Sequence, residues 1–323
     1  MTDLAAFMRR HFRHFNSRVA LQAAEAWVMH QRAGGRMFVT LAGAMSTAGI
    51  GRSLAPLIRA GAVHGISCTG ANLEEDLFLL LAADEYEPID DWRALRAEDD
   101  AALLERSMNR VTDTCIPETV MRHLERRLQR RWETCTAEGV AKLPSEHLFD
   151  VLDDPDLAQH FQADPADSWV LAAKEMGIPI WTPGWEDSTT GNVLTALVMQ
   201  GVLPHDRCVV TGTEQMRRLC DWYLAQRGHS VGFFQVGGGI AGDFAICAVP
   251  LLIQDLHVED VPLWGYFAQI SDAVTSYGGY SGAPPNEKIT WGKLGTDTPR
   301  FMIQSDASIV APMIFQYVLD ASE

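Results

Sequence analysis

The chain has 323 residues, of which 47% are hydrophobic, and its formal net charge is −16. So acidic a chain argues against nucleic-acid binding, which needs a basic face, and suits a cationic ligand. No apolar run reaches membrane-spanning length, no signal-peptide pattern follows the N-terminus, and the six cysteines lack metal-ligand spacing, so we expect a cytoplasmic protein without a metal site.

Predicted strands alternate with predicted helices over most of the chain. In order, we predict a helix over 17–30, a strand over 36–42, a helix over 50–60, a strand over 62–68, helices over 69–81, 168–176 and 193–199, a strand over 207–211, a helix over 214–227, strands over 232–236, 264–271 and 301–304, and a last helix to the C-terminus. This alternation predicts an α/β fold with a doubly wound, mostly parallel, Rossmann-like sheet.

No repeat or linker divides the sequence, so we predict a single domain over residues 1–323. Residues 1–35 are expected to form an N-terminal helical extension. Residues 86–164 are charged and helical in pattern, and we predict that they form a helical insertion.

Two turns after predicted strands are candidates for binding phosphate groups. Residues 43–49 are small, although they lack the GxGxxG pattern, whereas Gly-Gly-Gly-Ile-Ala-Gly at 237–242 satisfies it between a strand and a helix. Such turns let backbone N–H groups approach phosphate oxygens at a helix N-terminus. The glycine pattern at 237–242 is explained equally well by a flexible strand-to-helix turn that binds no phosphate.

The segment 281–293, Ser-Gly-Ala-Pro-Pro-Asn-Glu-Lys-Ile-Thr-Trp-Gly-Lys, places a carboxylate, an indole and an amine close together. Desolvation beside Trp291 lowers the pKa of an ammonium group, so Lys293 is a candidate imine-forming nucleophile. The indole can hold a substrate cation, and Glu287 can anchor a second ammonium group. The alternative is a surface loop in which the lysine stem covers a half-buried tryptophan.

This segment resembles the active-site segment of the deoxyhypusine synthase family. The match covers Ser281, Gly282, Ala283, Pro285, Glu287, Trp291, Gly292 and Lys293. Residues 69–77, Thr-Gly-Ala-Asn-Leu-Glu-Glu-Asp-Leu, resemble a second motif of that family, although acidic residues in the first turn of a helix can also serve only to stabilise it. The resemblance extends from about residue 43 to the C-terminus.

The resemblance implies that NAD takes up and returns a hydride while an aminobutyl group passes from spermidine through a Lys293 imine to an acceptor amine. The NAD contacts it implies are Gly43, Ala44, Met45, Ser46, Thr47, Thr69, Gly70, Ala71, Glu75, Asp187, Gly239, Asp272, Ala273, Asp306 and Ala307. The substrate contacts it implies are Glu74, Glu75, Asn192, Phe244, Gly278, Gly279, Tyr280, Glu287 and Trp291.

Three departures from the family pattern affect the donor pocket. The family's histidine falls on Phe244, or on Asp243 if the alignment shifts by one residue, and two aspartates are replaced by Asn192 and Tyr280. These exchanges remove a base and negative charge from the expected polyamine site. They favour a small-amine acceptor, as in the related homospermidine synthases, over a lysine of translation factor 5A.

A non-catalytic protein that binds NAD or a polyamine is the third hypothesis. The resemblance also implies a homotetramer with active sites between paired subunits. Lys293 and the segments near Gly43 and Glu74 could then come from different chains.

Overall fold

Apolar strand segments build the central sheet, as the sequence predicts. The computed structural model describes residues 3–275 and 278–322. Six strands form the sheet in the order β6-β2-β1-β7-β8-β9, and every neighbouring pair is parallel. They are β1 (Arg36–Leu41), β2 (Gly65–Cys68), β6 (Ile180–Trp181), β7 (Val231–Val236), β8 (Tyr266–Ser271) and β9 (Arg300–Gln304). This order, in which the chain turns back at the β1–β7 pair, is that of a Rossmann sheet, so the predicted α/β fold is confirmed.

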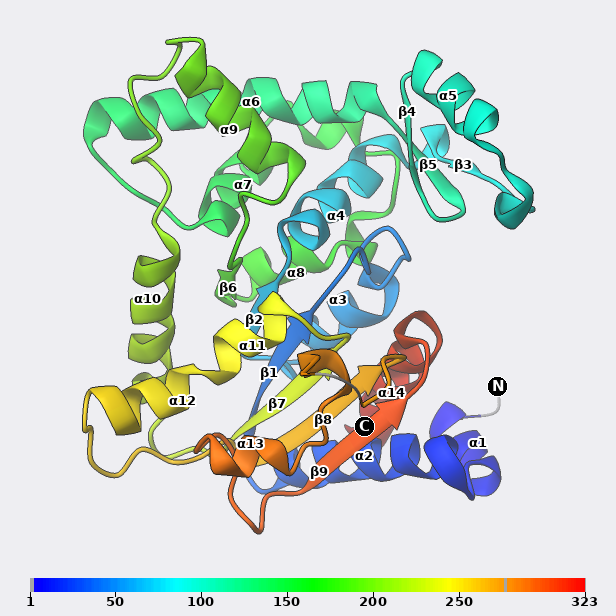
Figure 1. Cartoon of the computed structure of the whole chain (residues 1–323), viewed down its shortest axis with the longest axis vertical. Helices are drawn as coiled ribbons and strands as arrows, with labels where there is room; N and C mark the ends of the chain where they lie inside the picture. The colour runs from blue at the N-terminus through cyan, green and yellow to red at the C-terminus, as the bar shows by residue number, and fades with distance from the viewer. Residues whose placement is uncertain (1–2, 276–277, 323) are drawn as a thin grey trace.

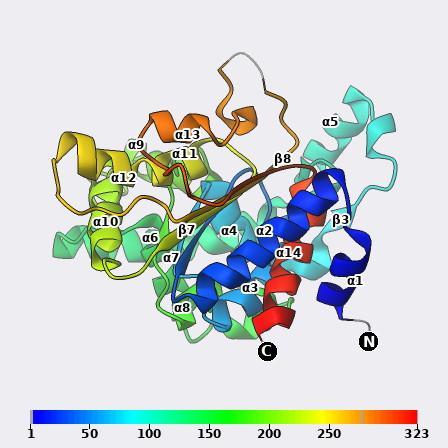
Figure 2. The same cartoon turned by 90° about the horizontal axis from the view of Figure 1, so that it is seen from below.

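Helices cover both faces of the sheet (Figures 1 and 2). The helices are α1 (Leu4–His11), α2 (Phe15–Arg32), α3 (Gly51–Arg59), α4 (Gly70–Ala82), α5 (Ala97–Glu105), α6 (Glu118–Glu138), α7 (Pro144–Leu152), α8 (Trp169–Glu175), α9 (Thr189–Met199), α10 (Gly212–Ala225), α11 (Ile240–Ile246), α12 (Ala248–Pro250), α13 (Glu287–Thr290) and α14 (Ala307–Ser322). Helices α2, α3 and α14 lie on one face, whereas α10, α11 and α12 lie on the other.

Alternation along the strands divides the core into two layers. Phe38, Phe233 and Phe267 point into the layer beneath α10 and α11, where Phe38 and Phe233 stack with ring centroids 5.7 Å apart. Their chain neighbours Val39 and Phe234 point into the larger layer beneath α2 and α14. Because both faces are covered, the strands are largely apolar on both faces, with buried polar exceptions such as Gln235 and Gln269, instead of alternating between apolar and polar residues.

Three local predictions need correction. Residues 86–164 contain helices α5, α6 and α7 but also a three-stranded antiparallel sheet of β3 (Glu87–Pro88), β5 (Thr114–Pro117) and β4 (Met108–Val111). Residues 207–211 form no strand, and Val209 makes only an isolated bridge to Lys142. Helix α9 begins at Thr189, four residues before the predicted start of that helix at residue 193.

A buried carboxylate fixes α8 beside α4. Asp76 accepts hydrogen bonds from the hydroxyl of Ser168 at 2.5 Å and from the N–H groups of Trp169 and Val170 at 3.3 and 3.1 Å. Burial raises its pKa to about 6, although these donors act in the opposite direction. Asp76 therefore satisfies donors of the first turn of α8 that no solvent reaches.

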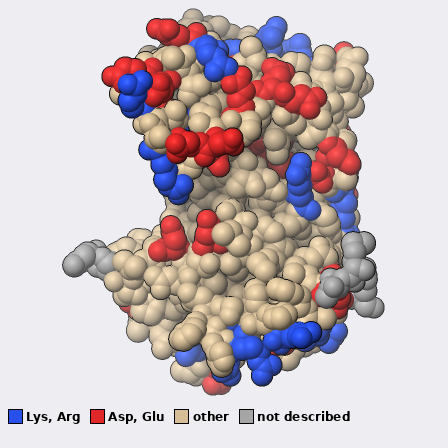
Figure 3. All heavy atoms as spheres, turned by 90° about the vertical axis from the view of Figure 1, so that its right-hand side faces the viewer, with Lys and Arg blue, Asp and Glu red and all other residues tan. Residues whose placement is uncertain are grey.

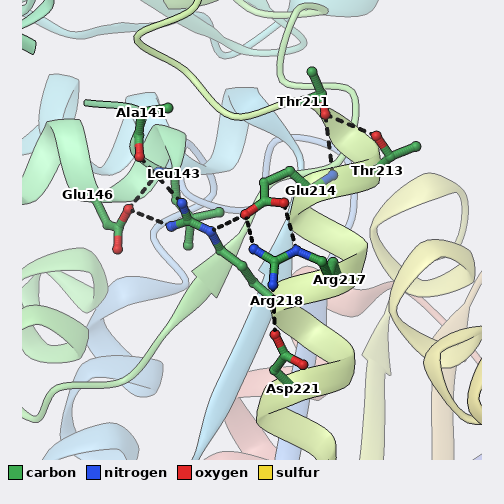
Figure 4. A network of polar contacts seen from close by, with 9 residues as sticks. All are labelled: Ala141, Leu143, Glu146, Thr211, Thr213, Glu214, Arg217, Arg218 and Asp221. Carbon is green, nitrogen blue, oxygen red and sulfur yellow. Dashed lines mark hydrogen bonds and ion pairs between the residues drawn. The ribbon is translucent and has the colours of Figure 1, made fainter. Parts of the chain in front are cut away.

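Exposed ion pairs contrast with this buried group. At the start of α10, Glu214 binds Arg217 at 2.6 Å and Arg218 at 3.1 Å, and Arg217 also reaches Asp221 at 3.3 Å (Figure 4). Hydrogen bonds from the two arginines lower the pKa of Glu214 to about 2. Solvent screens these pairs, so they add little to stability.

We expect Asp76→Ala to lower the free energy of unfolding by about 2–5 kcal/mol, because it leaves three buried donors without an acceptor. The matched variant Asp221→Ala removes one carboxylate from an exposed pair and is expected to cost at most about 0.5 kcal/mol. Denaturant unfolding of both variants measures the difference. Equal losses in the two variants would contradict the role given to Asp76.

Candidate active site

The carboxyl ends of four parallel strands surround a cavity of about 400 Å³, here called the sheet-edge cavity. It is lined by Ala42, Gly43, Ala44, Met45, Thr47, Ala48, Val111, Thr112, Asp113, Thr114, Gly237, Ile270, Ser271, Asp272, Ser305, Asp306 and Ala307. It lies between the β4–β5 hairpin and the sheet, on the side of the molecule shown in Figure 3, where the surface is hollowed below a group of acidic side chains. Ligands of open α/β sheets bind at such an edge, where the strand order reverses.

The loop after β1 is held in place by α4. The side-chain amide of Asn72 donates to the carbonyl oxygens of Leu41, Ala42 and Gly43 at 3.2, 3.0 and 2.8 Å. The hydroxyl of Thr69 donates to the Gly43 oxygen at 2.7 Å. These bonds fix the carbonyl oxygens inward toward α4, so the loop has one defined shape at the mouth of the cavity.

The residues of this cavity fit a dinucleotide such as NAD. Gly43 and Gly237 have φ values of +60° and +80°, and a Cβ atom on Gly237 would lie 2.9 Å from Ala42, so the backbone itself forms this wall. Two exposed carboxylates, Asp272 and Asp306, follow β8 and β9 at the rim. Carboxylates at such positions can accept hydrogen bonds from ribose hydroxyls.

The structure places some of the expected cofactor residues in the wall of the sheet-edge cavity and others outside it. Those that line the sheet-edge cavity are Gly43, Ala44, Met45, Thr47, Asp272, Asp306 and Ala307. Those that lie outside its wall are Ser46, Thr69, Gly70, Ala71, Glu75, Asp187, Gly239 and Ala273. Ser46 is buried between Asn72 and Trp169, to which it hydrogen-bonds, so its role is structural.

The hairpin residues 111–114 were missed by sequence reasoning. They line the sheet-edge cavity from the small antiparallel sheet, within a segment predicted to be helical. The positive φ of Thr112, +54°, marks the tight turn. The only sequence signal for this turn is the polar triplet Thr-Asp-Thr between Val111 and Cys115.

A second cavity, of about 540 Å³ and here called the acidic cavity, lies between α4, α6 and α9. It is lined by Glu74, Glu75, Phe78, Asn109, Val111, Ile116, Glu118, Met121, Arg122, Glu125, Thr189, Asn192, Val193, Ala196, Leu197 and Gln200. Glu74 accepts the N–H groups of Thr189 and Thr190 at 2.9 and 2.8 Å, at the N-terminus of α9. Of the expected substrate residues, this cavity brings together Glu74, Glu75 and Asn192.

Glu75 connects the acidic cavity with the sheet-edge cavity. Its carboxylate accepts a short hydrogen bond from the hydroxyl of Thr47, which lines the sheet-edge cavity. Burial raises the pKa of Glu75 to about 7, with a further increase from the neighbouring charge of Glu74, while the Thr47 bond opposes the change. A carboxyl group with this pKa can gain or lose a proton near neutral pH.

A third cavity, of about 420 Å³ and here called the lysine cavity, contains the segment singled out in the sequence. It is lined by Asp243, Cys247, Pro250, Leu251, Asp255, Tyr280, Ala283, Glu287, Lys288, Trp291 and Lys293. The structure thus brings together Tyr280, Glu287, Trp291 and Lys293 from the sequence prediction. Gly278 and Gly279 are exposed and do not line it, and Asp243 lines it in place of Phe244, which packs against the core.

The backbone around Lys293 is tightly held. Its N–H donates to the Lys288 oxygen at 3.0 Å, and its own oxygen accepts the N–H of Trp264 at 3.2 Å. Gly292 has a φ of +68°, which lets the chain turn between Trp291 and Lys293. The amine then lies 6.0 Å from the centroid of the Trp291 ring, whose side chain is 63% exposed.

The lysine loop is also fastened to the sheet. The buried amide of Gln269 on β8 donates to the oxygens of Gly237 and Ser281 at 3.0 and 3.1 Å. Gly238 lies against Ser281 so closely that a Cβ atom there would collide with the serine side chain. The glycine turn after β7 and the lysine loop are therefore one packed unit, which places the lysine cavity beside the strand ends.

Sequence reasoning missed Asp255 and Lys288 and left Asp243 as an alternative. Burial raises the pKa of Asp243, and the positive charges of Lys288 and Lys293 oppose that shift.

Within residues 3–275 and 278–322, no group of three or more His, Cys, Asp or Glu side chains is placed to hold a metal ion. None of the helices in those ranges has the length and apolar character needed to cross a membrane.

The family model and the similar known proteins point to the same family. The family model for deoxyhypusine synthase matches residues 4–318. A deoxyhypusine synthase-like protein of Thermosynechococcus vestitus is 30% identical over 290 residues, covering 87% of this chain and 69% of the relative. The protein named "Probable deoxyhypusine synthase 1" of Methanosarcina acetivorans is 28% identical over 281 residues, covering 87% and 79%.

The fold is also found among solved structures. A candidate deoxyhypusine synthase from Entamoeba histolytica superposes with a TM-score of 0.58 at 13% identity, covering 94% of this chain and 87% of that one. At this identity the likeness concerns the fold alone.

The raised pKa of Glu75 has a consequence for stability. The folded protein binds the proton of the Glu75 carboxyl group more tightly than the unfolded chain does. Protonation of Glu75 therefore contributes to the free energy of unfolding in full below about pH 4.5, and this contribution is lost as the pH rises through about 7. We expect Glu75→Gln, which cannot ionise, to match the native protein near pH 4.5 and to be about 1–3 kcal/mol more stable at pH 8.

Denaturant unfolding across this pH range measures the effect. Glu105→Gln, at an exposed glutamate, is the control and is expected to differ from the native protein by no more than about 0.5 kcal/mol at any pH. A constant difference between Glu75→Gln and the native protein would rule out the raised pKa.

Proposed function

The chain belongs to the deoxyhypusine synthase family of transferases, and we propose that it is an NAD-dependent aminoalkyl transferase that acts through an imine on Lys293. The donor is spermidine or a related polyamine, and the acceptor is a small amine. One observation carries the proposal: Lys293 lies in a defined cavity with Trp291 and Glu287, on a loop packed against the glycine turn of the sheet edge.

When bound in the sheet-edge cavity, NAD supplies the acceptor and later the donor of a hydride, so it is not consumed. The residues proposed to hold it are the glycine-lined wall at Gly43 and Gly237 and the rim carboxylates Asp272 and Asp306. Thr47 and Glu75 extend this wall toward the acidic cavity. Glu75 can take up or release a proton there because its pKa lies near 7.

Lys293 performs the transfer step in this proposal. Its free amine attacks the C=N carbon of the oxidised donor, a bond forms to the lysine nitrogen, and the bond to the departing diamine breaks as that diamine takes up a proton. Trp291 forms a wall along the aminobutyl chain, and Glu287 binds its terminal ammonium group. Asp243 is the group in the cavity suited to exchange the proton, because burial raises its pKa.

A small-amine acceptor is favoured over a protein lysine because two carboxylates of the family pattern are absent, at Asn192 and Tyr280. Each charge-assisted hydrogen bond to an ammonium group contributes about 1.5–3 kcal/mol, so a site without them binds a long polyamine less tightly. Modification of translation factor 5A is the second candidate function, and binding of NAD or a polyamine without turnover is the third.

The expected substrate residues that line a cavity are divided between two cavities of one chain. Glu74, Glu75 and Asn192 line the acidic cavity, whereas Glu287, Trp291 and Lys293 line the lysine cavity, and the two walls share no residue. We propose that a second copy completes the site, in a homotetramer with active sites between paired subunits. The lysine of one copy then meets the carboxylates of the other.

Incubation with NAD and spermidine, followed by borohydride trapping and peptide mass spectrometry, tests the reaction. We expect an aminobutyl adduct on Lys293, and none on that peptide in Lys293→Ala. Lys174→Ala, which removes an ion-paired surface lysine, is expected to retain the adduct. Bound NAD without an adduct would support the non-catalytic alternative, and turnover with translation factor 5A but no small amine would support the second candidate.

Mixed oligomers test the shared site. We expect Lys293→Ala and Glu75→Gln each to lose most of the transferase activity, and a co-refolded mixture to recover part of it, because some interfaces then combine an intact lysine cavity with an intact acidic cavity. Light scattering gives the assembly size. A monomer at micromolar concentration, or a mixture no more active than its parts, would contradict the arrangement.

A further inference from the structure

A cavity of about 520 Å³, here called the basic cavity, lies at the amino ends of three strands. Arg36 is the first residue of β1, His64 directly precedes β2, and His229 lies two residues before β7. All three line the cavity, together with Arg32 at the end of α2. The sheet-edge cavity lies at the other ends of β1 and β7, on the order of 20 Å away at about 3.3 Å per residue of strand. The basic cavity is therefore separate from the proposed NAD site.

This cavity is basic in a chain that is acidic as a whole. The described residues that line it include no Asp or Glu, although the sequence has 42 acidic side chains and only 26 of Lys and Arg. Its two arginines have uncharged partners within the described part of the chain. Arg32 donates to the carbonyl oxygen of Ala321 at 2.8 Å, and Arg36 donates to the side-chain oxygen of Gln226. No carboxylate of the wall neutralises either charge.

The buried side chain of Gln226 fixes the direction of the Arg36 guanidinium group. Its amide nitrogen donates to the carbonyl oxygen of Trp222 at 3.0 Å, so its oxygen is the atom left to accept the bond from Arg36. Gln226 is 6% exposed, whereas Arg36 is half-buried at the cavity wall. Of the five N–H donors that a guanidinium group carries, one has a partner among the described residues. Arg36 is thus held in place with most of its donors unused.

His64 is held beside Arg36 by two hydrogen bonds to β1. Its backbone N–H donates to the Met37 oxygen at 2.8 Å, and its Nδ1 accepts the N–H of Met37 at 3.2 Å. Burial, followed by the neighbouring positive charges with Arg36 first among them, lowers the pKa of His64 to about 4. The ring is therefore neutral at pH 7, and since Nδ1 is an acceptor, its hydrogen is on Nε2. That N–H is a further donor at the wall.

Helix ends explain only part of this basic group. The ends of α2, α3 and α14 lie at the cavity, and the negative end of a helix dipole favours basic side chains. Arg32 has this role, because it donates to Ala321 near the end of α14. Arg36 and His64 belong to the strand ends, and the partners of their side chains are a glutamine side chain and β1. Helix capping therefore leaves these two residues unexplained.

We propose that the basic cavity binds phosphate, either as the free ion or as the phosphate group of a small molecule. A guanidinium group can bind phosphate through two parallel N–H bonds. The tetrahedral dianion also has further oxygens for donors from the other chain segments of the wall, whereas a carboxylate has only two oxygens. The volume of the cavity is in the range of small-molecule sites. This site uses neither Lys293 nor NAD, so it goes beyond the proposed function and does not depend on it.

Protection of Arg36 from an arginine reagent tests the proposal in the native protein. p-Hydroxyphenylglyoxal modifies guanidinium groups, and peptide mass spectrometry follows its reaction with Arg36 and with Arg96, an exposed arginine outside the cavity. Inorganic phosphate, AMP and succinate would be compared at constant ionic strength. At about ten times its dissociation constant, a bound phosphate is expected to slow the modification of Arg36 about 10-fold. We expect Arg96 to react at an unchanged rate and succinate to give less than about 2-fold protection of Arg36.

Equilibrium dialysis with radiolabelled inorganic phosphate measures the affinity of variants. Arg36→Met is expected to weaken binding about 10- to 100-fold, and Arg36→Lys, which keeps the charge but loses the planar fork, is expected to lie between it and the native protein. The matched variant Arg96→Met is expected to bind as the native protein does. Circular dichroism establishes that each variant is folded.

The outcomes identify the ligand or overturn the site. Protection of Arg36 by both phosphate and AMP supports a site for a phosphate group carried by a small molecule, and protection by phosphate alone supports a site for the free ion. Protection by neither, equal protection by succinate, or equal protection of Arg96 overturns the proposal. So does phosphate binding in Arg36→Met that is as tight as in the native protein. The protection experiment needs no variant, so the test does not depend on whether Arg36→Met folds.

Discussion

The parallel pairing of β1 with β7 is the constraint on which the candidate site depends. It aligns Leu41 with Val236, so the two strands end together and the turns that follow them lie side by side. Gly43 and Gly237 then form one wall without side chains, and the lysine loop packs onto the second turn through Gly238 and Gln269. A register shift by one residue would turn every side chain of a strand to the other face and separate these segments.

The sequence predicted the sheet well because its strands are covered on both faces. Largely apolar runs such as residues 231–236, in which Gln235 is the one polar side chain, indicate buried strands in a chain that alternates them with helices. It failed for β3, β4 and β5, which are short and carry charged or polar residues such as Glu87 and Arg110. Their identity as strands depends on pairing with each other, which no local pattern reports.

The candidate site was predictable where the residues are neighbours in the chain. Glu287, Trp291 and Lys293 lie within one segment of seven residues, so their common cavity follows from spacing. The sequence could not decide whether Asp243 or Phe244 faces the cavity, because this depends on the rotation of α11 about its axis. The packing of Phe244 against the core fixes that rotation. Lys288 was missed because its motif position looked like a spacer, and only burial distinguishes it from a surface lysine.

The packing that positions the titratable groups of the acidic cavity and the lysine cavity also keeps them partly shielded from solvent. Burial raises the pKa of Glu75, although the hydrogen bond from Thr47 opposes this change, and burial also raises the pKa of Asp243 beside the lysine loop. Neither fully pairs with a charge of its own chain. A folded protein tolerates such groups only where their cost is small beside the core, or where a ligand or second copy supplies the missing partner. The acidic cavity and the lysine cavity carry these groups separately, and the proposed pairing of two copies would bring the carboxylates of one cavity to the ammonium groups of the other.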